Sequence, residues 1–138
     1  MINFPIKIIF SLLVAVFVLI LVGMFVPGVG TRLFETAGPV VVFCEWGLFF
    51  LLGALLIILI LKNKVEGRLK KFLLITGISA VGFLVFVLLH NLVSGLLSTI
   101  FNKEIEEPVF FILATLICPV AFLVGAIGTI ISLIKQKT

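Results

Sequence analysis

An acid and a histidine inside otherwise apolar stretches are the residues of this chain best suited to chemistry. Glu45 and His90 are the acidic and basic side chains that fall within its long hydrophobic runs. Hydrocarbon makes a charged side chain costly, so such a residue is a functional candidate. A carboxylate and an imidazole at one depth could share a proton or bind a cation, and an imidazole titrates near physiological pH. These two residues therefore head the candidate functional residues of the chain.

Residue counts place the two side chains at matching heights. Glu45 lies 17 residues before Lys62, which corresponds to roughly 25 Å of helix. His90 lies 19 residues after Lys71, or roughly 28 Å. Counting in the same way from the nearest lysine gives similar heights for three sulfur-containing residues, Met24, Cys44 and Cys118.

Two interpretations of this layer differ in what the polar groups do. In a structural interpretation, Glu45 reaches headgroups or water beside an interfacial Trp46, while His90 and Asn91 bond to a neighbouring helix. In a functional interpretation, Glu45, His90, Asn91 and Ser94 form a proton or cation site open to the outer face. Three acids would then concentrate cations at its mouth: Glu104, Glu106 and Glu107.

A third interpretation is a metal or haem site built from cysteine, methionine and histidine ligands. It requires side chains from several segments to converge. The chain has no HxxxH, CxxC or CxxCH spacing that would indicate such a site. Neither a metal ligand set nor a cofactor is predicted.

Four long apolar segments must position these residues. The chain has 138 residues, of which 63% are hydrophobic and 12% charged, about half the charge of a typical soluble domain. Hydrocarbon about 30 Å thick needs about 20 residues of helix, and only helices satisfy every backbone group within one segment. We predict a single domain over 1–138, an all-α integral membrane protein with a four-transmembrane-helix bundle. Its spans are 8–26, 40–61, 72–98 and 109–134.

The lengths of the third and first apolar runs decide whether each forms one ordinary membrane span. The third is longer than a bilayer needs and includes Gly95 near its end, so the helix is expected to tilt, to extend outward or to break at Gly95. The first run has an apolar stretch of 19 residues. A cleaved signal peptide has a shorter one, typically about 7–15 residues, so the first run is predicted to remain as a span.

The distribution of bases predicts the orientation. Arg32 and Lys103 are the only two bases in the segments after the first and third runs. The remaining eight flank the other ends of the runs: Lys7, Lys62, Lys64, Arg68, Lys70, Lys71, Lys135 and Lys137. The positive-inside rule then places both termini in the cytoplasm, in the plasma or inner membrane of a cell. The net charge of +4 thus indicates lipid headgroups as partners of the bases rather than nucleic acid.

Small residues recur along one face of the last run. Small side chains let another helix approach closely. Close approach matters in a bilayer, where helices associate through packing and hydrogen bonds rather than by escaping water. The partner helix could belong to the same bundle, to another copy or to a larger complex. Pro119 frees the carbonyl of Thr115 and predicts a kink. The stripe consists of Ala114, Cys118, Ala121, Gly125, Gly128 and Ser132.

The residue patterns do not favour an enzyme. No Ser-His-acid order, nucleotide loop or metalloprotease helix occurs, and the chain has a single histidine and no tyrosine. We expect a non-enzymatic membrane subunit or accessory protein that packs against another copy or a larger complex. The alternative is a small oligomeric proton- or cation-coupled transporter or ion conductor that uses Glu45 and His90. A metal- or haem-binding membrane protein ranks third.

Overall fold

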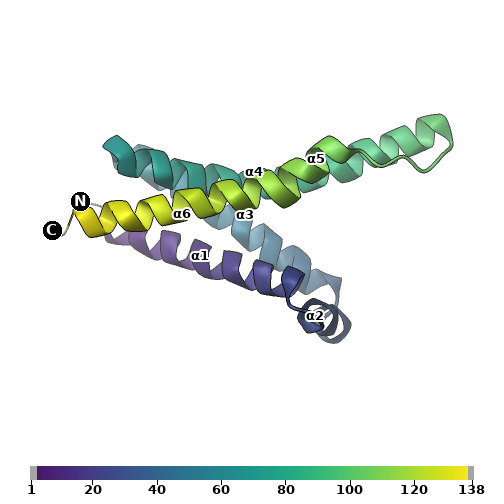
Figure 1. The fold of residues 1–138 in the computed structure, drawn as a ribbon, viewed down its shortest axis with the longest axis horizontal. Coiled ribbons are helices and arrows are strands. Elements are labelled where there is room, and N and C mark those ends of the chain that lie inside the picture. The colour runs from purple at the N-terminus through teal and green to yellow at the C-terminus, as the bar shows by residue number, and fades with distance from the viewer. Residues whose placement is uncertain (1–2, 137–138) are drawn as a thin grey trace.

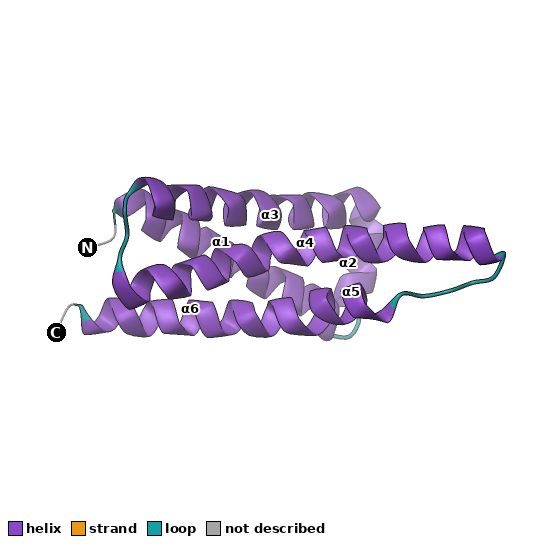
Figure 2. Ribbon diagram, turned by 90° about the horizontal axis from the view of Figure 1, so that it is seen from above, coloured by secondary structure: helices purple, strands orange, loops and turns teal. Residues whose placement is uncertain are grey.

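The computed structural model is all-helical in the part of the chain that it describes, residues 3–136 without the side chains of Leu33, Phe34 and Ala37 (Figures 1 and 2). Four helices are long and apolar enough to cross a membrane, which confirms the prediction of four long apolar helices. They are α1 (Phe4–Phe25), α3 (Pro39–Lys62), α4 (Gly67–Phe101) and the last span, Pro108–Lys135.

A fifth, shorter helix joins the first two spans. This helix, α2 (Val29–Ala37), lies between turns at Gly28 and Gly38, whose φ angles are +81° and +75°. Glycine adopts such angles without strain. The spans themselves begin and end within about five residues of their predicted limits, but no helix was predicted between the first two apolar runs, where α2 lies.

The third span is one long, unbroken helix. Its 35 residues pass through Gly95 without interruption and end at Phe101, so the break that was one of the predicted outcomes does not occur. At about 1.5 Å per residue the helix is about 52 Å long, well beyond the hydrocarbon thickness. Asn102 then takes a left-handed conformation with φ of 48°. The following segment, 103–107, runs back along α4 (Figure 2).

The last span contains a π-helical turn just before Pro119. It consists of α5 (Pro108–Ile112), a π-helical turn (Leu113–Ile117) and α6 (Cys118–Lys135). Pro119 has no N–H and its ring crowds the carbonyl four residues earlier. One turn with wider hydrogen-bond spacing relieves that crowding. The irregularity therefore occurs where the sequence predicts a kink, in the form of a π-helical turn.

Four phenylalanines, one from each spanning helix, meet at the centre of the structure. The Phe17 and Phe122 rings stack with centroids 4.1 Å apart, and Phe49 lies 5.4 Å from Phe122 and 6.1 Å from Phe83. We call these four residues the aromatic centre. Their packing provides contacts that lipid tails do not reproduce. All four of these phenylalanines are buried within the structure. Others do lie exposed: Phe4, Phe25, Phe43, Phe101 and Phe111.

The stripe of small residues on the last span lies against α4 of the same chain. A Cβ atom on Gly125 would lie 2.7 Å from the backbone nitrogen of Thr76 and 2.9 Å from the carbonyl oxygen of Phe72. A Cβ on Gly128 would collide with the Phe72 ring. The two glycines are buried, as are Ala114 and Cys118. The remaining members are half-buried: Ala121 and Ser132.

The two ends of the structure differ in charge. The described N-terminus, the α3–α4 turn and the C-terminus share one end (Figure 1), where Asn3 Nδ2 donates to Asn63 Oδ1 at 2.6 Å. Seven of the eight bases assigned to this side lie there, and Lys137 is outside the described residues. We call it the base-rich end. The opposite, distal end holds α2 and the segment 102–107, and toward it the α1–α3 and α4–α6 pairs diverge (Figure 1).

Candidate functional site

The aromatic centre gives a reference for the depth of the candidate residues. Phe49 lies 13 residues from Lys62, or roughly 20 Å. In a 30 Å hydrocarbon layer that begins near the lysines, the distal surface is then roughly 10–15 Å beyond the aromatic centre. Glu45 lies four residues beyond Phe49, and His90 seven residues beyond Phe83, which corresponds to roughly 6 and 10 Å. Both side chains therefore fall within the hydrocarbon thickness.

Glu45 lines a cavity between α1, α2 and α3. The cavity has a volume of about 620 Å³, and we call it the Glu45 cavity. Its walls include Met24, Gly30, Cys44 and Trp46. The Glu45 side chain is half-buried. Within residues 3–136, no hydrogen-bond donor or cationic group pairs with its carboxylate.

His90 belongs to a different arrangement, at the distal end of α4. Its Nδ1 lies 2.7 Å from the carbonyl oxygen of Glu107. Because a carbonyl can only accept, Nδ1 donates and carries a proton. One turn further, Ser94 Oγ accepts from the Glu107 N–H at 2.9 Å. Ser98 Oγ accepts from the Ile105 N–H at 3.0 Å and donates to the Ile105 carbonyl at 3.2 Å. These three side chains hold the returning segment against α4.

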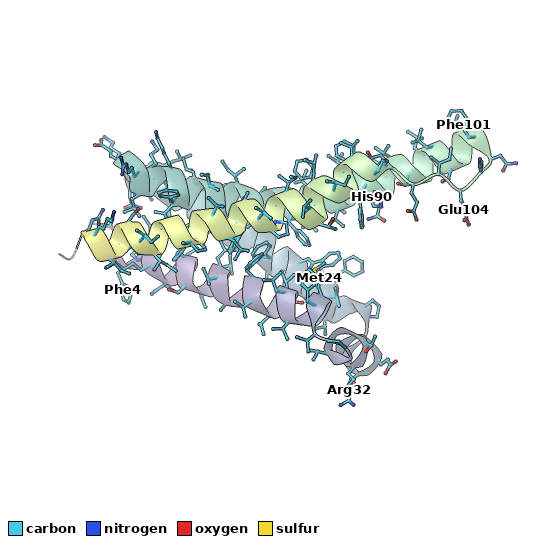
Figure 3. The ribbon with its side chains drawn as sticks, in the orientation of Figure 1. Phe4, Met24, Arg32, His90, Phe101 and Glu104 are labelled. Carbon is cyan, nitrogen blue, oxygen red and sulfur yellow. The ribbon has the colours of Figure 1, made fainter. Side chains whose placement is uncertain are left out.

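The carboxylate of Glu107 caps the last span. Its oxygens accept from the N–H groups of Val109 at 2.6 Å and Phe110 at 2.9 Å, which satisfies two of the free donors at the start of α5. One of these oxygens also lies 3.8 Å from His90 Nδ1. The negative charge of Glu107 is thus engaged at a helix start. Of the other two acids in the predicted mouth, Glu104 and Glu106 are exposed, and Glu104 lies near the tip (Figure 3).

The predicted site is thus divided between two parts of the molecule. His90 and Ser94 both contact the backbone of Glu107, whereas Glu45 lines its own cavity. Figure 3 shows His90 on one of the two diverging pairs of helices and Met24, a wall of the Glu45 cavity, on the other. Asn91 is exposed, and its amide donates to the Val87 carbonyl of its own helix at 2.8 Å.

The sulfur-containing residues are also dispersed. Cys44 and Met24 line the Glu45 cavity, whereas Cys118 is buried and its sulfur lies beside Gly82 of α4. In the described part of the chain, no three or more His, Cys, Asp and Glu side chains are grouped so that they could hold a metal ion.

Two residues have roles that the sequence interpretation missed. Trp46, expected beside Glu45 as an interfacial residue, lines the Glu45 cavity and packs edge-on against Phe83 at 5.6 Å. Its position three residues before Phe49 was the available signal, because that spacing shares a helix face. Ser98 is the third side chain of α4 that bonds to the returning segment. The sequence pattern that could have indicated this role is the spacing of four residues along His90, Ser94 and Ser98.

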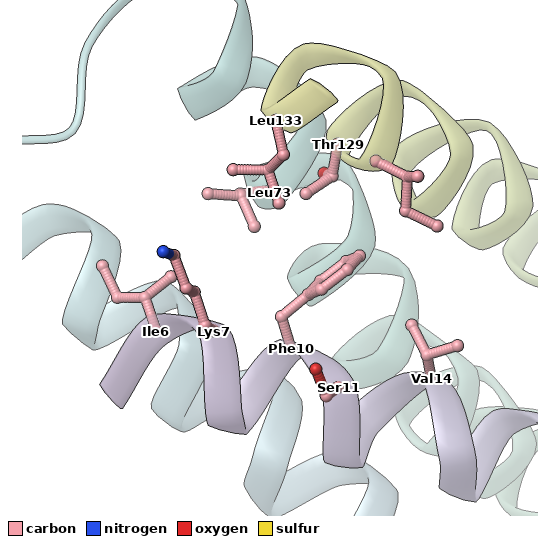
Figure 4. Close-up of a pocket in the computed structure, with 9 residues that line it drawn as sticks. Ile6, Lys7, Phe10, Ser11, Val14, Leu73, Thr129 and Leu133 are labelled. Atoms are coloured by element: carbon pink, nitrogen blue, oxygen red, sulfur yellow. The ribbon is translucent and has the colours of Figure 1, made fainter. Parts of the chain in front are cut away.

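A second cavity lies near the base-rich end, between α1, α4 and α6 (Figure 4). Its volume is about 410 Å³, and Lys7, Ser11 and Thr129 are among its lining residues. The buried Thr129 hydroxyl has no hydrogen-bond partner among the described residues. The one charged side chain here is a lysine, so this cavity does not suit a cation.

Comparison with known proteins found no matching family model, no matching curated protein and no matching solved structure.

Replacement of Ser94 by alanine should loosen the segment that returns along α4. The Glu107 N–H would lose its acceptor, at a cost of about 1 kcal/mol, so we expect about fivefold faster amide hydrogen exchange over 104–107. Mass spectrometry of the detergent-solubilised protein measures this exchange. The matched control is Thr99→Ala, because the Thr99 hydroxyl bonds only to Gly95 of its own helix. Equal protection of the segment in both variants would show that the Ser94 contact does not hold it.

Proposed function

We propose that this chain is a small multi-pass protein of the cell membrane that binds a cation at Glu45 and, as an oligomer, carries it across the bilayer. The supporting observation is the unpaired Glu45 carboxylate, which lines a cavity within the span of α3. An unneutralised carboxylate in hydrocarbon is costly. A bound cation would offset that cost, and four helices alone rarely enclose a wide pathway, which favours an oligomer.

The proposed orientation places the base-rich end in the cytoplasm. Both termini would then be cytoplasmic, and α2 and the segment 102–107 would face the outside. Support comes from the gathering of bases at one end of the four apolar helices. In this orientation the Glu45 cavity lies in the outer half of the bilayer.

The proposal assigns His90 no part in binding the cation. Its Nδ1–H is already directed at the Glu107 carbonyl, and its contacts with Glu107 and Phe111 lie on the α4–α5 side. The pair of Glu45 and His90 expected from their heights is therefore replaced by Glu45 alone.

Flux measurements on reconstituted vesicles test the transport proposal. Uptake of a labelled cation added outside the vesicles reports transport directly, with K⁺ and an organic ammonium as the first two probes, and a pH-sensitive dye inside reports whether protons move with it. Glu45→Gln removes the charge at nearly constant size, so we expect the flux to fall at least tenfold, to the leak of empty vesicles. Glu106→Gln, a change at an exposed distal acid, should retain it. Equal flux in wild-type, Glu45→Gln and empty vesicles would refute transport at Glu45.

A second candidate function is a non-enzymatic subunit that assembles through the distal part of α4. The helix face opposite to His90, Ser94 and Ser98 is apolar and exposed, because a shift of two residues corresponds to about 200° around the helix. The exposed fractions of its members range from 58% to 68%. These members are Leu88, Leu92, Leu96 and Ile100.

Part of this apolar face extends past the hydrocarbon. Leu96 and Ile100 lie 13 and 17 residues beyond Phe83, or roughly 20 and 25 Å, so both lie beyond the distal surface of the hydrocarbon. Exposed apolar side chains in that position favour a protein partner. Copies of one membrane protein stand parallel at the same height, so the same face of a second copy can meet it across a two-fold axis.

Cross-linking in membranes tests this second candidate. The double variant Leu96→Ser and Ile100→Ser should reduce the cross-linked dimer several-fold, whereas Val124→Ser, on an exposed position of α6, should leave it unchanged. Substitution of Gly125 would be uninformative, because a side chain there meets the backbone of α4 and disturbs the fold itself. Loss of dimer in neither variant, or in both, would count against assembly through this face.

A further inference from the structure

We infer that the ligand of the Glu45 cavity is a hydrophobic organic cation, an amine or quaternary ammonium on a bulky apolar body. The inference rests on the proposed role of Glu45 as a cation site and specifies the chemistry of the cation. Glu45 is the one charged residue among those described as lining the cavity, and nearly all the others are apolar. A cavity of about 620 Å³ is large enough for a drug-sized molecule.

The lining does not suit divalent inorganic cations such as calcium and magnesium. Calcium and magnesium take about six or more oxygen ligands in proteins. The Glu45 carboxylate has two oxygens, and no other carboxylate, amide or hydroxyl side chain is among the residues described as lining the cavity. A monopositive organic cation needs one counter-charge and an apolar surround, which is what this cavity provides.

Trp46 adds a second feature that suits an organic cation. The faces of tryptophan rings attract ammonium groups more strongly than those of other aromatic side chains. The Trp46 ring lines the cavity and is held edge-on by Phe83 at 5.6 Å and by Phe43 at 6.2 Å. The polarizable and flexible side chain of Met24 forms another part of the wall, and such a side chain can adapt to ligands of different shape.

Charge, rather than apolar contact, should decide which molecules bind. A hydrophobic molecule already dissolved in lipid gains little from apolar walls, because lipid tails are equally apolar. The ion pair with Glu45 is the interaction that lipid tails cannot offer, and it is strengthened by the low dielectric constant around it. The cavity should therefore discriminate between a cation and an anion of the same size and shape.

The fluorescence of Trp46 can report ligand binding in the Glu45 cavity. Trp46 is its only tryptophan and tyrosine is absent, so the intrinsic fluorescence comes from the cavity wall. Tetraphenylphosphonium, titrated into the purified full-length protein in detergent, should change this fluorescence in a saturable way. It should also slow maleimide labelling of Cys44, which lines the cavity and is exposed, whereas Cys118 is buried. Tetraphenylborate, an anion of the same shape, should produce neither saturable effect.

Two variants separate charge from folding. Glu45→Gln should weaken tetraphenylphosphonium binding at least tenfold, whereas Glu45→Asp, which retains the charge, should bind within a few-fold of the wild type. Equal saturable responses to both probes, or unchanged affinity in Glu45→Gln, would overturn the inference and indicate an apolar crevice that lipid tails fill. Binding without any flux would support the ligand class while refuting transport. Flux of K⁺ or protons without phosphonium binding would refute the ligand class and leave transport at Glu45 standing.

Discussion

Hydrocarbon offers no hydrogen-bond partner, so a polar side chain within the spans is stabilised only by a partner inside the protein. Hydroxyl groups do so locally: Thr76 and Ser79 donate to carbonyls four residues earlier on their own helix. Thr129 is a neutral exception, and leaving it unpaired costs little compared with a charge. A carboxylate can only accept hydrogen bonds, and the helix around Glu45 has no free N–H to offer it. This constraint singles out Glu45 from the polar residues of the spans.

Part of this architecture could be predicted from the sequence, because hydrocarbon thickness sets the length of a span. The four apolar helices follow from length alone, whereas length left open whether the third run would tilt, extend or break near Gly95. The direction of each side chain around its helix does not, since counting residues gives height only. Glu45 and His90 therefore matched in height and yet face different neighbours. The aromatic centre was missed for a related reason, because a phenylalanine facing lipid and one facing a helix, such as Phe25 and Phe17, occur in equally apolar surroundings.

The distal half of the molecule combines two surfaces with different chemistry. On the α4 side, His90, Ser94 and Ser98 engage the backbone of the returning segment, and the opposite face of the helix is apolar and exposed. On the α1–α3 side, Glu45 lines a cavity with largely apolar walls. Cation binding and assembly would thus use separate parts of the chain, and assembly through α4 would leave the Glu45 cavity free.

A protein that crosses the bilayer four times has the two ends of its helices in different aqueous compartments. A membrane-impermeant maleimide tests this directly on single-cysteine variants, Lys64→Cys and Glu104→Cys, in a chain whose Cys44 and Cys118 are replaced by serine. In intact cells, the cysteine at position 104 should be labelled, and the one at position 64 should react only after the membrane is permeabilised. Labelling at both positions in intact cells would contradict the four crossings, and the reverse pattern would contradict the orientation that places the Glu45 cavity in the outer half of the bilayer.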